Sequence, residues 1–242
     1  MITEEGFLDF KCPYCGEPVS FPADNAGFAV ACPTCMESLI VPADGSEVGG
    51  ALPFPVTTPR LVLRRLRMGD WKDLLELHSD EELFHYHEGG QLEEEQVIRW
   101  LENDSHVKLT TPGQPFCLGI ELQDGGKLIG YLSLQFTDPQ RLQANLDIFL
   151  SRMQQRKGFA TEALAVVLDF CFEGISLHRV TASCDSRNVA ACRVCEKLGM
   201  RREGVSLKDR FVNGQWVDTV YYALLAEEYR QTSGSPAEGT PA

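Results

Sequence analysis

Residues 146–162 decide the fold, and they read Leu146-Asp-Ile-Phe-Leu-Ser-Arg-Met-Gln-Gln-Arg-Lys-Gly-Phe-Ala-Thr-Glu162. The pattern predicts a strand that ends near Leu150, a short basic turn containing Gly158, and an apolar helix near 160–172. The first amides of a helix have no acceptors within the helix, and the helix dipole favours negative charge. The stretch therefore predicts an anion-binding site. Its glycine spacing fits neither a Walker loop nor a dinucleotide-binding fingerprint.

The flanking segments predict an α/β domain over residues 58–230. Strands are expected at 60–67, 116–122, 127–136, 144–150, 178–184, 210–212 and 216–225, and helices at 70–78, 91–103, 160–172 and 188–198. The order β-α-α-β-β-β-α-β-α-β-β predicts a mixed sheet with helices on its faces. We expect residues 46–57 to be a linker and residues 231–242 to be a disordered tail, because both lack apolar periodicity.

An internal repeat within residues 1–45 predicts a metal site. Two Cys-x-x-Cys turns lie 20 residues apart, and the glutamate and the Pro-Ala-Asp that follow each turn repeat as well. The candidate ligands are Cys12, Cys15, Cys32 and Cys35. Two residues between cysteines let one turn point both sulfurs at a single ion, and two turns complete a tetrahedron. A segment this short needs such a cross-link, because it buries too little surface to be stable alone.

This module resembles a zinc ribbon, with Met36 where the second turn usually carries glycine. Four cysteine ligands leave no open coordination position, so we expect a structural Zn²⁺. Residues 1–55 carry eight acidic side chains and one basic side chain, and the overall net charge is −13. Docking on a phosphate backbone would be repulsive. We therefore expect no nucleic acid partner and propose a protein contact or dimerisation for the ribbon, with the oligomeric state open.

The composition excludes several classes of protein. Of the 242 residues, 43% are hydrophobic, so the chain can bury a core and is not disordered throughout. No apolar run reaches the ~20 residues that span a bilayer, and the acidic N-terminus lacks the basic region of a signal peptide. Nine cysteines without an export signal indicate a reducing compartment. We expect a cytoplasmic protein that does not bind membranes.

Segments spread over residues 58–230 resemble the GNAT acetyltransferase superfamily, and in particular its branch of ribosomal-protein N-terminal and small-amine acetyltransferases. They are Thr58-Pro-Arg-Leu-Val-Leu-Arg64, Gln155-Arg-Lys-Gly-Phe-Ala-Thr-Glu-Ala-Leu164, Leu177-His-Arg-Val-Thr-Ala182, Asn188-Val-Ala-Ala191, Glu196-Lys-Leu-Gly-Met200 and Phe211-Val-Asn-Gly-Gln-Trp-Val-Asp218. The resemblance implies a mixed, mostly antiparallel sheet flanked by helices, and an N-acetyltransferase that uses acetyl-CoA.

By this resemblance, backbone amides from Arg156 to Thr161 hold the CoA pyrophosphate. The backbone around Phe149 and Leu150 pairs with the pantetheine arm and polarises the thioester carbonyl. Asn188 hydrogen-bonds the cofactor near the acceptor; it is also a good N-cap for the next helix, and the two roles are compatible. The implied cofactor-binding residues are Phe149, Leu150, Gln155, Arg156, Lys157, Gly158, Phe159, Ala160, Thr161 and Asn188.

The family's usual proton donors are absent. The place of its tyrosine, seven residues after the asparagine, holds Cys195, and the place of the serine proposed in the ribosomal branch holds Ala191. A thiol with a reference pKa near ~8.5 can donate a proton, so Cys195 is a candidate acid. The alternative for Cys195 is a small apolar residue of the helix core.

Two carboxylates are candidates for the base. Some family members carry a glutamate on the fourth strand, where this chain has Asn145; Asp147 lies two residues on and shares its face. Glu88, in His85-Tyr-His-Glu88, lies between the first two helices, which border the family's acceptor site. The alternatives are a solvated or salt-bridged carboxylate at Asp147 and surface or capping roles for the histidines.

Charge suggests the acceptor. Residues 70–104 carry twelve acidic and two basic side chains, which would attract a cation beside the acceptor cleft, although some must be solvated helix surface. We expect a cationic primary amine: a polyamine-like molecule, an aminoglycoside-like molecule or a basic protein N-terminus. Two other interpretations stay open. One is a GNAT-fold module that senses CoA without efficient turnover, and the other is a ribbon that recruits the enzyme to a partner protein.

Overall fold

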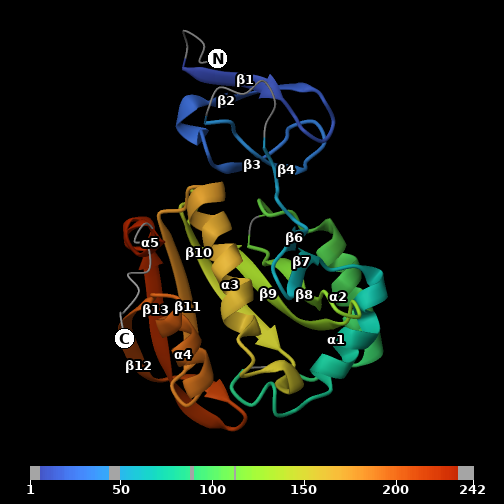
Figure 1. The fold of residues 1–242 in the computed structure, drawn as a ribbon, viewed down its shortest axis with the longest axis vertical. Coiled ribbons are helices and arrows are strands. Elements are labelled where there is room, and N and C mark those ends of the chain that lie inside the picture. The colour runs from blue at the N-terminus through green and yellow to red at the C-terminus, as the bar shows by residue number, and fades with distance from the viewer. Residues whose placement is uncertain (1–5, 44–49, 88–89, 112, 234–242) are drawn as a thin grey trace, which may run out of the picture.

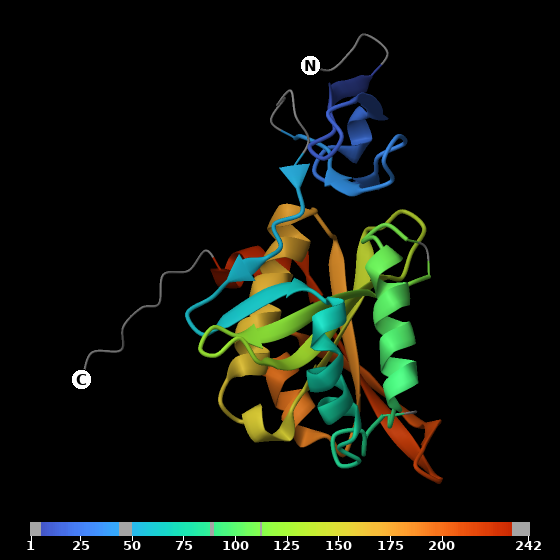
Figure 2. The same ribbon diagram turned by 90° about the vertical axis from the view of Figure 1, so that its right-hand side faces the viewer.

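The computed structural model describes residues 6–43, 50–87, 90–111 and 113–233 (Figure 1). A small N-terminal module lies beyond one end of a larger α/β domain (Figures 1 and 2). The module contains a hairpin of β1 (Phe7–Lys11) and β2 (Pro18–Pro22), a turn of 3-10 helix (Ala23–Asn25), and a sheet of β3 (Ala29–Ala31), β4 (Ser38–Ile40) and β5 (Gly50–Ala51).

One mixed sheet forms the centre of the larger domain. Its strands are β6 (Val56–Thr57), β7 (Leu61–Arg65), β8 (Phe116–Leu122), β9 (Leu128–Phe136), β10 (Gln143–Leu150), β11 (Arg179–Asp185), β12 (Arg201–Val212) and β13 (Gln215–Leu225). Their order in the sheet is β12-β13-β11-β10-β9-β8-β7-β6. Only β10 and β11 pair in parallel; the other neighbours are antiparallel.

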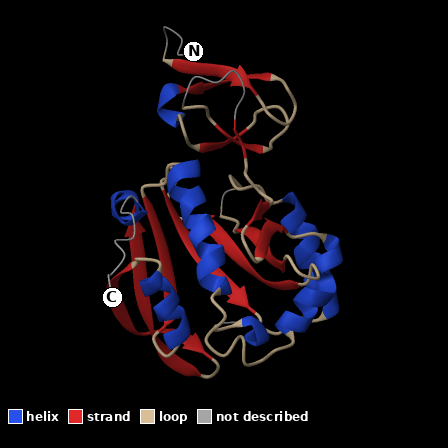
Figure 3. Cartoon of the chain, viewed as in Figure 1, coloured by secondary structure: helices blue, strands red, loops and turns tan. Residues whose placement is uncertain are grey.

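Helices cover both faces of this sheet (Figures 2 and 3). They are α1 (Trp71–His78), α2 (Glu94–His106), α3 (Phe159–Asp169), α4 (Val189–Lys197) and α5 (Ala226–Ser233), with short turns at Met68–Asp70 and Arg152–Gln154 and a π turn at Phe170–Gly174. Because side chains of a strand alternate between faces, β10 serves two cores. Leu146 and Leu150 pack with α3, whereas Phe149 packs against the cluster under α1 and α2.

The fold class and the predicted order of strands and helices in the larger domain are confirmed, but some boundaries differ. β12 begins at Arg201, not at residue 210, because its outward side chains give no apolar alternation; Leu207 is 77% exposed. Its pairing with β13 is also interrupted between Ser206 and Arg210. α2 begins at Glu94 rather than 91, because Glu93 and Gln96 form a reciprocal capping box that fixes its start.

α5 has no counterpart among the predicted elements. It is a short helix held by a contact with a segment distant in the sequence: Tyr229 stacks on Phe172 with ring centroids 4.9 Å apart. Its last turn reaches into the predicted tail at 231–242, of which 234–242 lie outside the described residues. The predicted linker at 46–57 contains β5 and β6, while its residues 46–49 lie outside the described part of the chain.

The N-terminal module packs directly on the larger domain. Ala29 belongs to the main hydrophobic core, and the buried Ser38 hydroxyl lies 3.1 Å from that of Thr110 in the loop before β8. Lys108 forms an ion pair with Glu37 beside it. These contacts lie at the end of the sheet where β8 and β10 begin, since Arg141, just before β10, also donates to the Thr110 carbonyl.

Candidate active site

A cavity of about 780 Å³ opens where β10 and β11 separate. The two strands pair only from Gln143–Arg179 to Asn145–Thr181, although both continue for several residues. Beyond that point each strand presents an edge of backbone donors and acceptors that the other does not satisfy. An extended ligand with amide groups can insert between such edges and complete their hydrogen bonds.

The N-terminus of α3 forms one end of this cavity. Gly158 is the N-cap and has a left-handed backbone (φ 85°), which glycine adopts at no steric cost. Glu162 is the first residue whose amide bonds back to Gly158, so the preceding amides have no helical acceptor. Arg156, Arg193 and Lys197 add positive charge to the cavity wall. The basic turn and the helix that the sequence predicts are therefore present at this end of the cavity, and an anion site there stays a prediction.

The turn before α3 is held by the residues that open the larger domain. Arg60 donates from Nη1 to the Lys157 carbonyl (2.9 Å) and from Nε to the Glu162 carboxylate (2.7 Å). Thr58 donates to the other oxygen of Glu162 (2.5 Å). An added Cβ on Gly158 would lie 3.3 Å from the Arg60 guanidinium, so this contact also favours glycine. The role of Thr58 and Arg60 was not predicted, because about 100 residues separate them from the turn.

Most of the predicted cofactor-binding residues gather around the cavity. The predicted residues that line it are Phe149, Leu150, Gln155, Arg156, Gly158, Phe159, Ala160, Thr161 and Asn188. Lys157 is not among the lining residues; its ammonium donates to Gln154 instead. Gln155 donates to the Leu150 carbonyl (3.0 Å), which fixes the turn against the end of β10.

Asn188 is the N-cap of α4, as expected. Its side-chain oxygen accepts from the Ala191 amide at 3.1 Å. The side chain also lines the cavity. Since the oxygen is used by the cap, the amide NH₂ group remains able to donate to a ligand.

Asp147 lies on the same strand face as Asn145 and Phe149, towards α1 and α2. Asn145 donates to it at 2.9 Å, so its carboxylate has one fixed partner. Burial raises the pKa of Asp147 above its ordinary value, while Arg210 and the Asn145 hydrogen bond act in the opposite direction. It lines the cavity. The second predicted base, Glu88, lies outside the described residues.

Cys195 forms part of a small group of thiols in the cavity wall. Cys184 and Cys195 both line the cavity, and the sulfur of Cys192 lies 3.6 Å from that of Cys184. A hydrogen bond from Cys184 lowers the pKa of Cys195, although burial opposes this. A lower pKa makes the Cys195 thiol a better proton donor.

Several cavity residues had no predicted role. His87 and Tyr86, from the connection between α1 and α2, line the cavity, as does Asp185 at the end of β11. Asp185 is buried and is held by the Arg187 guanidinium at 2.5 Å. The sequence alone suggests surface or capping roles for the histidines of His85-Tyr-His-Glu88, because nothing local distinguishes a surface histidine from one that lines a cavity.

Many of the acidic residues between 70 and 104 are paired elsewhere. The ion pairs are Asp70 with Arg64, Glu76 with Lys127, Asp80 with Arg152, Glu95 with Arg99 and Asp104 with Arg65. Of the described acids in this segment, Glu82 lines the cavity. Within the described part of the chain, the carboxylates on the cavity wall are therefore Glu82, Asp147 and Asp185. Two of these three come from strands rather than from the acidic segment.

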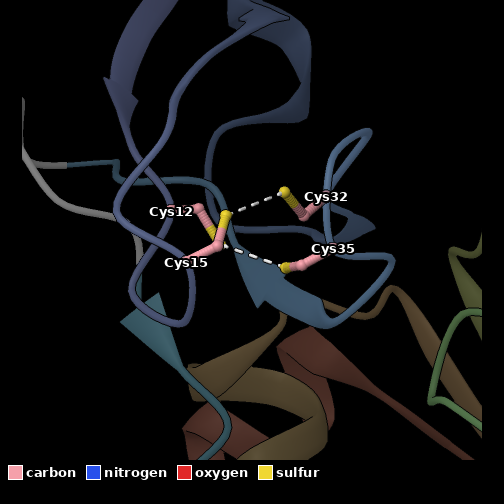
Figure 4. Close-up of side chains that lie close together, drawn as sticks. All are labelled: Cys12, Cys15, Cys32 and Cys35. Atoms are coloured by element: carbon pink, nitrogen blue, oxygen red, sulfur yellow. Dashed lines mark hydrogen bonds between the residues drawn. The ribbon is translucent and has the colours of Figure 1, made fainter.

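The four N-terminal cysteines come together at one point (Figure 4). Their sulfurs all lie within 4.8 Å of one another, with Cys12 to Cys35 at 3.7 Å and Cys15 to Cys32 at 3.9 Å. Zn–S bonds of about 2.3 Å at tetrahedral angles give sulfur separations of about 3.8 Å, so the residues fit a zinc ion. The Tyr14 and Thr34 amides point at the Cys12 and Cys32 sulfurs, which supports thiolate ligands.

The two cysteine turns have the same backbone shape. Gly16 and Met36 occupy equivalent places, with φ of 75° and 61°. Met36 therefore adopts the left-handed conformation that the missing glycine would favour, and its side chain is 60% exposed.

A family model described as an acetyltransferase (GNAT) domain matches residues 60–201, more than half of the chain. The uncharacterized N-acetyltransferase YnaD of Bacillus subtilis is 30% identical over 177 residues, which cover 72% of this chain and 98% of that protein. A GNAT-family acetyltransferase structure from Bacillus anthracis superposes with a TM-score of 0.64 at 27% identity, covering 71% of this chain and 98% of that one. This chain belongs to the GNAT acetyltransferase family and is an N-acetyltransferase.

Among the relatives is a spermidine N(1)-acetyltransferase of Vibrio cholerae, 25% identical over 175 residues that cover 72% of this chain and 98% of that protein. A structure of the V. cholerae spermidine N-acetyltransferase with CoA and spermine has a TM-score of 0.63 at 22% identity, covering 71% of this chain and 99% of that one, and shares the fold. No helix in the described part of the present chain is long and apolar enough to cross a membrane.

Proposed function

We propose that this N-acetyltransferase moves an acetyl group directly from acetyl-CoA to a cationic primary amine. The observation that carries the proposal is one continuous cavity between β10 and β11, with the basic N-terminal end of α3 at one side and Asp147 on its wall. The N-terminal end of α3 suits a phosphate group, and the wall at Asp147 suits an ammonium group.

The cofactor would follow the splayed strands. Amides from Arg156 to Thr161 would hold the pyrophosphate, with Arg193 and Lys197 adding charge from α4. The β10 edge at Phe149 and Leu150 would pair with the pantetheine arm and direct a backbone amide at the thioester carbonyl, where negative charge develops during transfer. Asn188 would donate its free amide hydrogens near the acetyl group.

The acceptor would lie on the side of the sheet that α1 and α2 cover. Glu82 and Asp147 favour a cation there, whereas the charge of Asp185 is already paired with Arg187. This supports a polyamine-like, an aminoglycoside-like or a basic N-terminal acceptor. Asp147 would remove a proton from the nitrogen as it attacks the thioester carbon, and Cys195 would protonate the departing thiolate. Glu88, by its place in the sequence, would be a further carboxylate beside this acceptor.

The N-terminal module would be a zinc ribbon of residues 1–45, joined by residues 46–57 to the acetyltransferase domain of residues 58–230. Cys12, Cys15, Cys32 and Cys35 would hold the ion, with a structural role. The contacts of Ser38 and Glu37 with Thr110 and Lys108 favour a module that stabilises the enzyme. Recruitment of a protein partner through its exposed acidic surface is compatible with this role.

The test is acetyl transfer, detected by mass, to a panel of polyamines, aminoglycosides and basic N-terminal peptides. We expect transfer to one of these cationic classes, and a loss of about 10²–10⁴-fold in kcat for Asp147→Asn with acetyl-CoA affinity unchanged. Asp124→Asn, an exposed carboxylate in the β8–β9 turn, is the matched control and should keep full activity. A preference for neutral or anionic amines would contradict the acceptor class. Acetyl-CoA binding without transfer to any amine would instead favour a sensing module.

A further inference from the structure

The structure points to a proton acceptor that neither the sequence motifs nor the family relationship assigns. We propose that His87 takes the first proton from the bound ammonium group of the acceptor and passes it to water in the cavity. The inference rests on the proposed function and adds to it. An ammonium acceptor must lose one proton before its nitrogen has a lone pair, and a second after it has bonded to the thioester carbon. In this scheme Asp147 serves the second step and His87 serves the first.

The position of His87 fits this role. Its ring lies against Phe149, with centroids 4.6 Å apart, and it lines the cavity. Phe149 follows Asp147 by two residues on β10, so both side chains project from the same face of the strand. An amine held by Asp147 is therefore bordered by the imidazole. Phe149 is also the strand position expected beside the thioester, which places His87 at the reacting end of the cavity.

Hydrogen bonds hold the segment that carries His87 at several points. The His87 amide donates to the Phe84 carbonyl at 3.0 Å, and Asn213, in the β12–β13 turn, donates to the His85 carbonyl at 3.0 Å. On the far side, a ring nitrogen of the buried His78 lies 2.8 Å from the Gly90 carbonyl. These contacts hold the backbone at His85, His87 and Gly90, and the ring contact with Phe149 positions the imidazole itself.

The surroundings of His87, burial first, favour its neutral imidazole. Burial lowers the pKa of His87 below its ordinary value of 6.5, and the Arg210 guanidinium on β12 lowers it further, while Asp185 on β11 acts in the opposite direction. Asp147 faces the same space from β10, and Arg187 lies over the neighbouring Tyr86 ring. A neutral imidazole has a free lone pair at neutral pH and can accept a proton.

Arg210 has the geometry of a positioning residue. The pairing of β12 with β13 shifts register between Ser206 and Arg210, and irregularities of this kind commonly re-aim a side chain. Its Nε donates to Thr219 at 2.8 Å, and its Nη2 atom is buried without a hydrogen-bond partner among the described residues. Arg210 does not line the cavity. Its charge therefore acts on His87 and Asp147 from behind the wall, without touching the acceptor.

The pH profile of acetyl transfer tests the role of His87. Because His87 must be neutral to accept a proton, the rate should fall as the pH drops through its lowered pKa, which lies below 6.5. In His87→Ala we expect a loss of about 10²-fold in kcat at neutral pH, with acetyl-CoA affinity unchanged. Added imidazole should restore part of the rate, which a purely structural role would not allow. His85→Ala is the matched control: this exposed neighbour does not line the cavity and should keep the wild-type profile.

The outcomes separate this inference from the proposed function. Transfer by wild type together with an unchanged rate and profile in His87→Ala would overturn the role of His87 and leave the acetyltransferase proposal standing. A loss of activity that imidazole does not rescue, accompanied by weaker acetyl-CoA binding, would also overturn it, because His87 would then shape the cofactor site. Absence of transfer to every amine by the wild type would overturn both.

Discussion

At the scale of single residues, Arg64 joins three segments of the larger domain through one buried guanidinium. It makes two 2.8 Å hydrogen bonds with Asp70 and donates to Glu121 on β8 at 2.7 Å. The side chains of Arg64 and Asp70 are 11% and 6% exposed. We expect Arg64→Met to lower the free energy of unfolding by about 3 kcal/mol, because it removes the main counter-charge of the buried Asp70. Arg67, 2.9 Å from Glu121, still pairs with that second carboxylate. Urea unfolding measures this loss.

The matched control for Arg64 is a pair that water already surrounds. Arg99 and Glu95 on α2 are 68% and 89% exposed, with charged atoms 3.7 Å apart. Arg99→Met should change the free energy of unfolding by less than about 1 kcal/mol. Equal losses in the two variants would show that burial does not decide the strength of these ion pairs.

The candidate site was predictable where its signals are local. Spacing along the chain placed the four cysteines, and strand alternation placed Asp147, which lines the cavity. His87 and Arg210 carried no such signal. Arg210 acts on Asp147 although β13 and β11 lie between β12 and β10 in the sheet, so its effect depends on how distant strands are arranged. Sequence patterns predict well which helix or strand a residue belongs to, but they predict poorly which distant residues it contacts.

At the scale of elements, the approach of β9 to β10 depends on Gly130. Gly130 lies opposite Leu150, and an added Cβ would overlap the Phe149 carbonyl oxygen and approach the Leu150 Cα at 3.0 Å. These backbone atoms of β10 cannot relieve the overlap by a change of rotamer, so Gly130→Ala must displace the end of the strand. Since that end is the proposed pantetheine-binding edge, we expect acetyl-CoA affinity to fall at least about 10-fold and the free energy of unfolding to fall by about 1–3 kcal/mol. Calorimetric titration and urea unfolding measure the two effects.

Gly119→Ala on β8 separates lost affinity from lost stability. There the added Cβ would meet the tips of the Leu128 and Leu66 side chains, which can move, rather than backbone. It should lower stability without changing acetyl-CoA affinity. A Gly130→Ala protein that binds acetyl-CoA as tightly as wild type would contradict the proposed role of the β10 edge.

Elements with a strong local pattern were predicted almost to the residue. β8 matches the predicted strand at 116–122 because it is buried along most of its length and is bounded by turn residues. β12 and α5 were predicted poorly or not at all, since β12 is largely exposed and α5 is held by its tertiary contacts. The separation of β10 from β11, which makes the cavity, has no signature in either strand alone. It is a property of the assembled sheet.

At the scale of the whole molecule, the N-terminal module and the cavity occupy opposite ends of the sheet. The module lies beyond the end of the sheet where β8 and β10 begin, and its Ser38 contacts Thr110 there (Figure 1). The cavity opens at the other end, where β10 ends. None of the described residues of the module lines the cavity. Its Ala29 nevertheless belongs to the core that α3 covers, so the two parts share buried surface. A role in stability follows more directly from this arrangement than a role in catalysis.

Removal of the proposed zinc ion should consequently destabilise the acetyltransferase domain. The metal would fix the turn that leads into Glu37 and Ser38, the residues that contact Lys108 and Thr110. In such modules the free energy of metal binding supplies the free energy of folding. Cys15→Ser removes one ligand at an exposed position, so it should unfold the module and remove its contacts with Lys108 and Thr110. We expect loss of bound zinc, measured by elemental mass spectrometry, and a fall of several degrees in the calorimetric Tm of the larger domain.

The control is Cys192→Ser, which replaces a thiol outside the cluster and should leave zinc bound. If the Tm of the larger domain were unchanged in zinc-free Cys15→Ser, the module would be an independent appendage, and recruitment of a partner would become its better explanation.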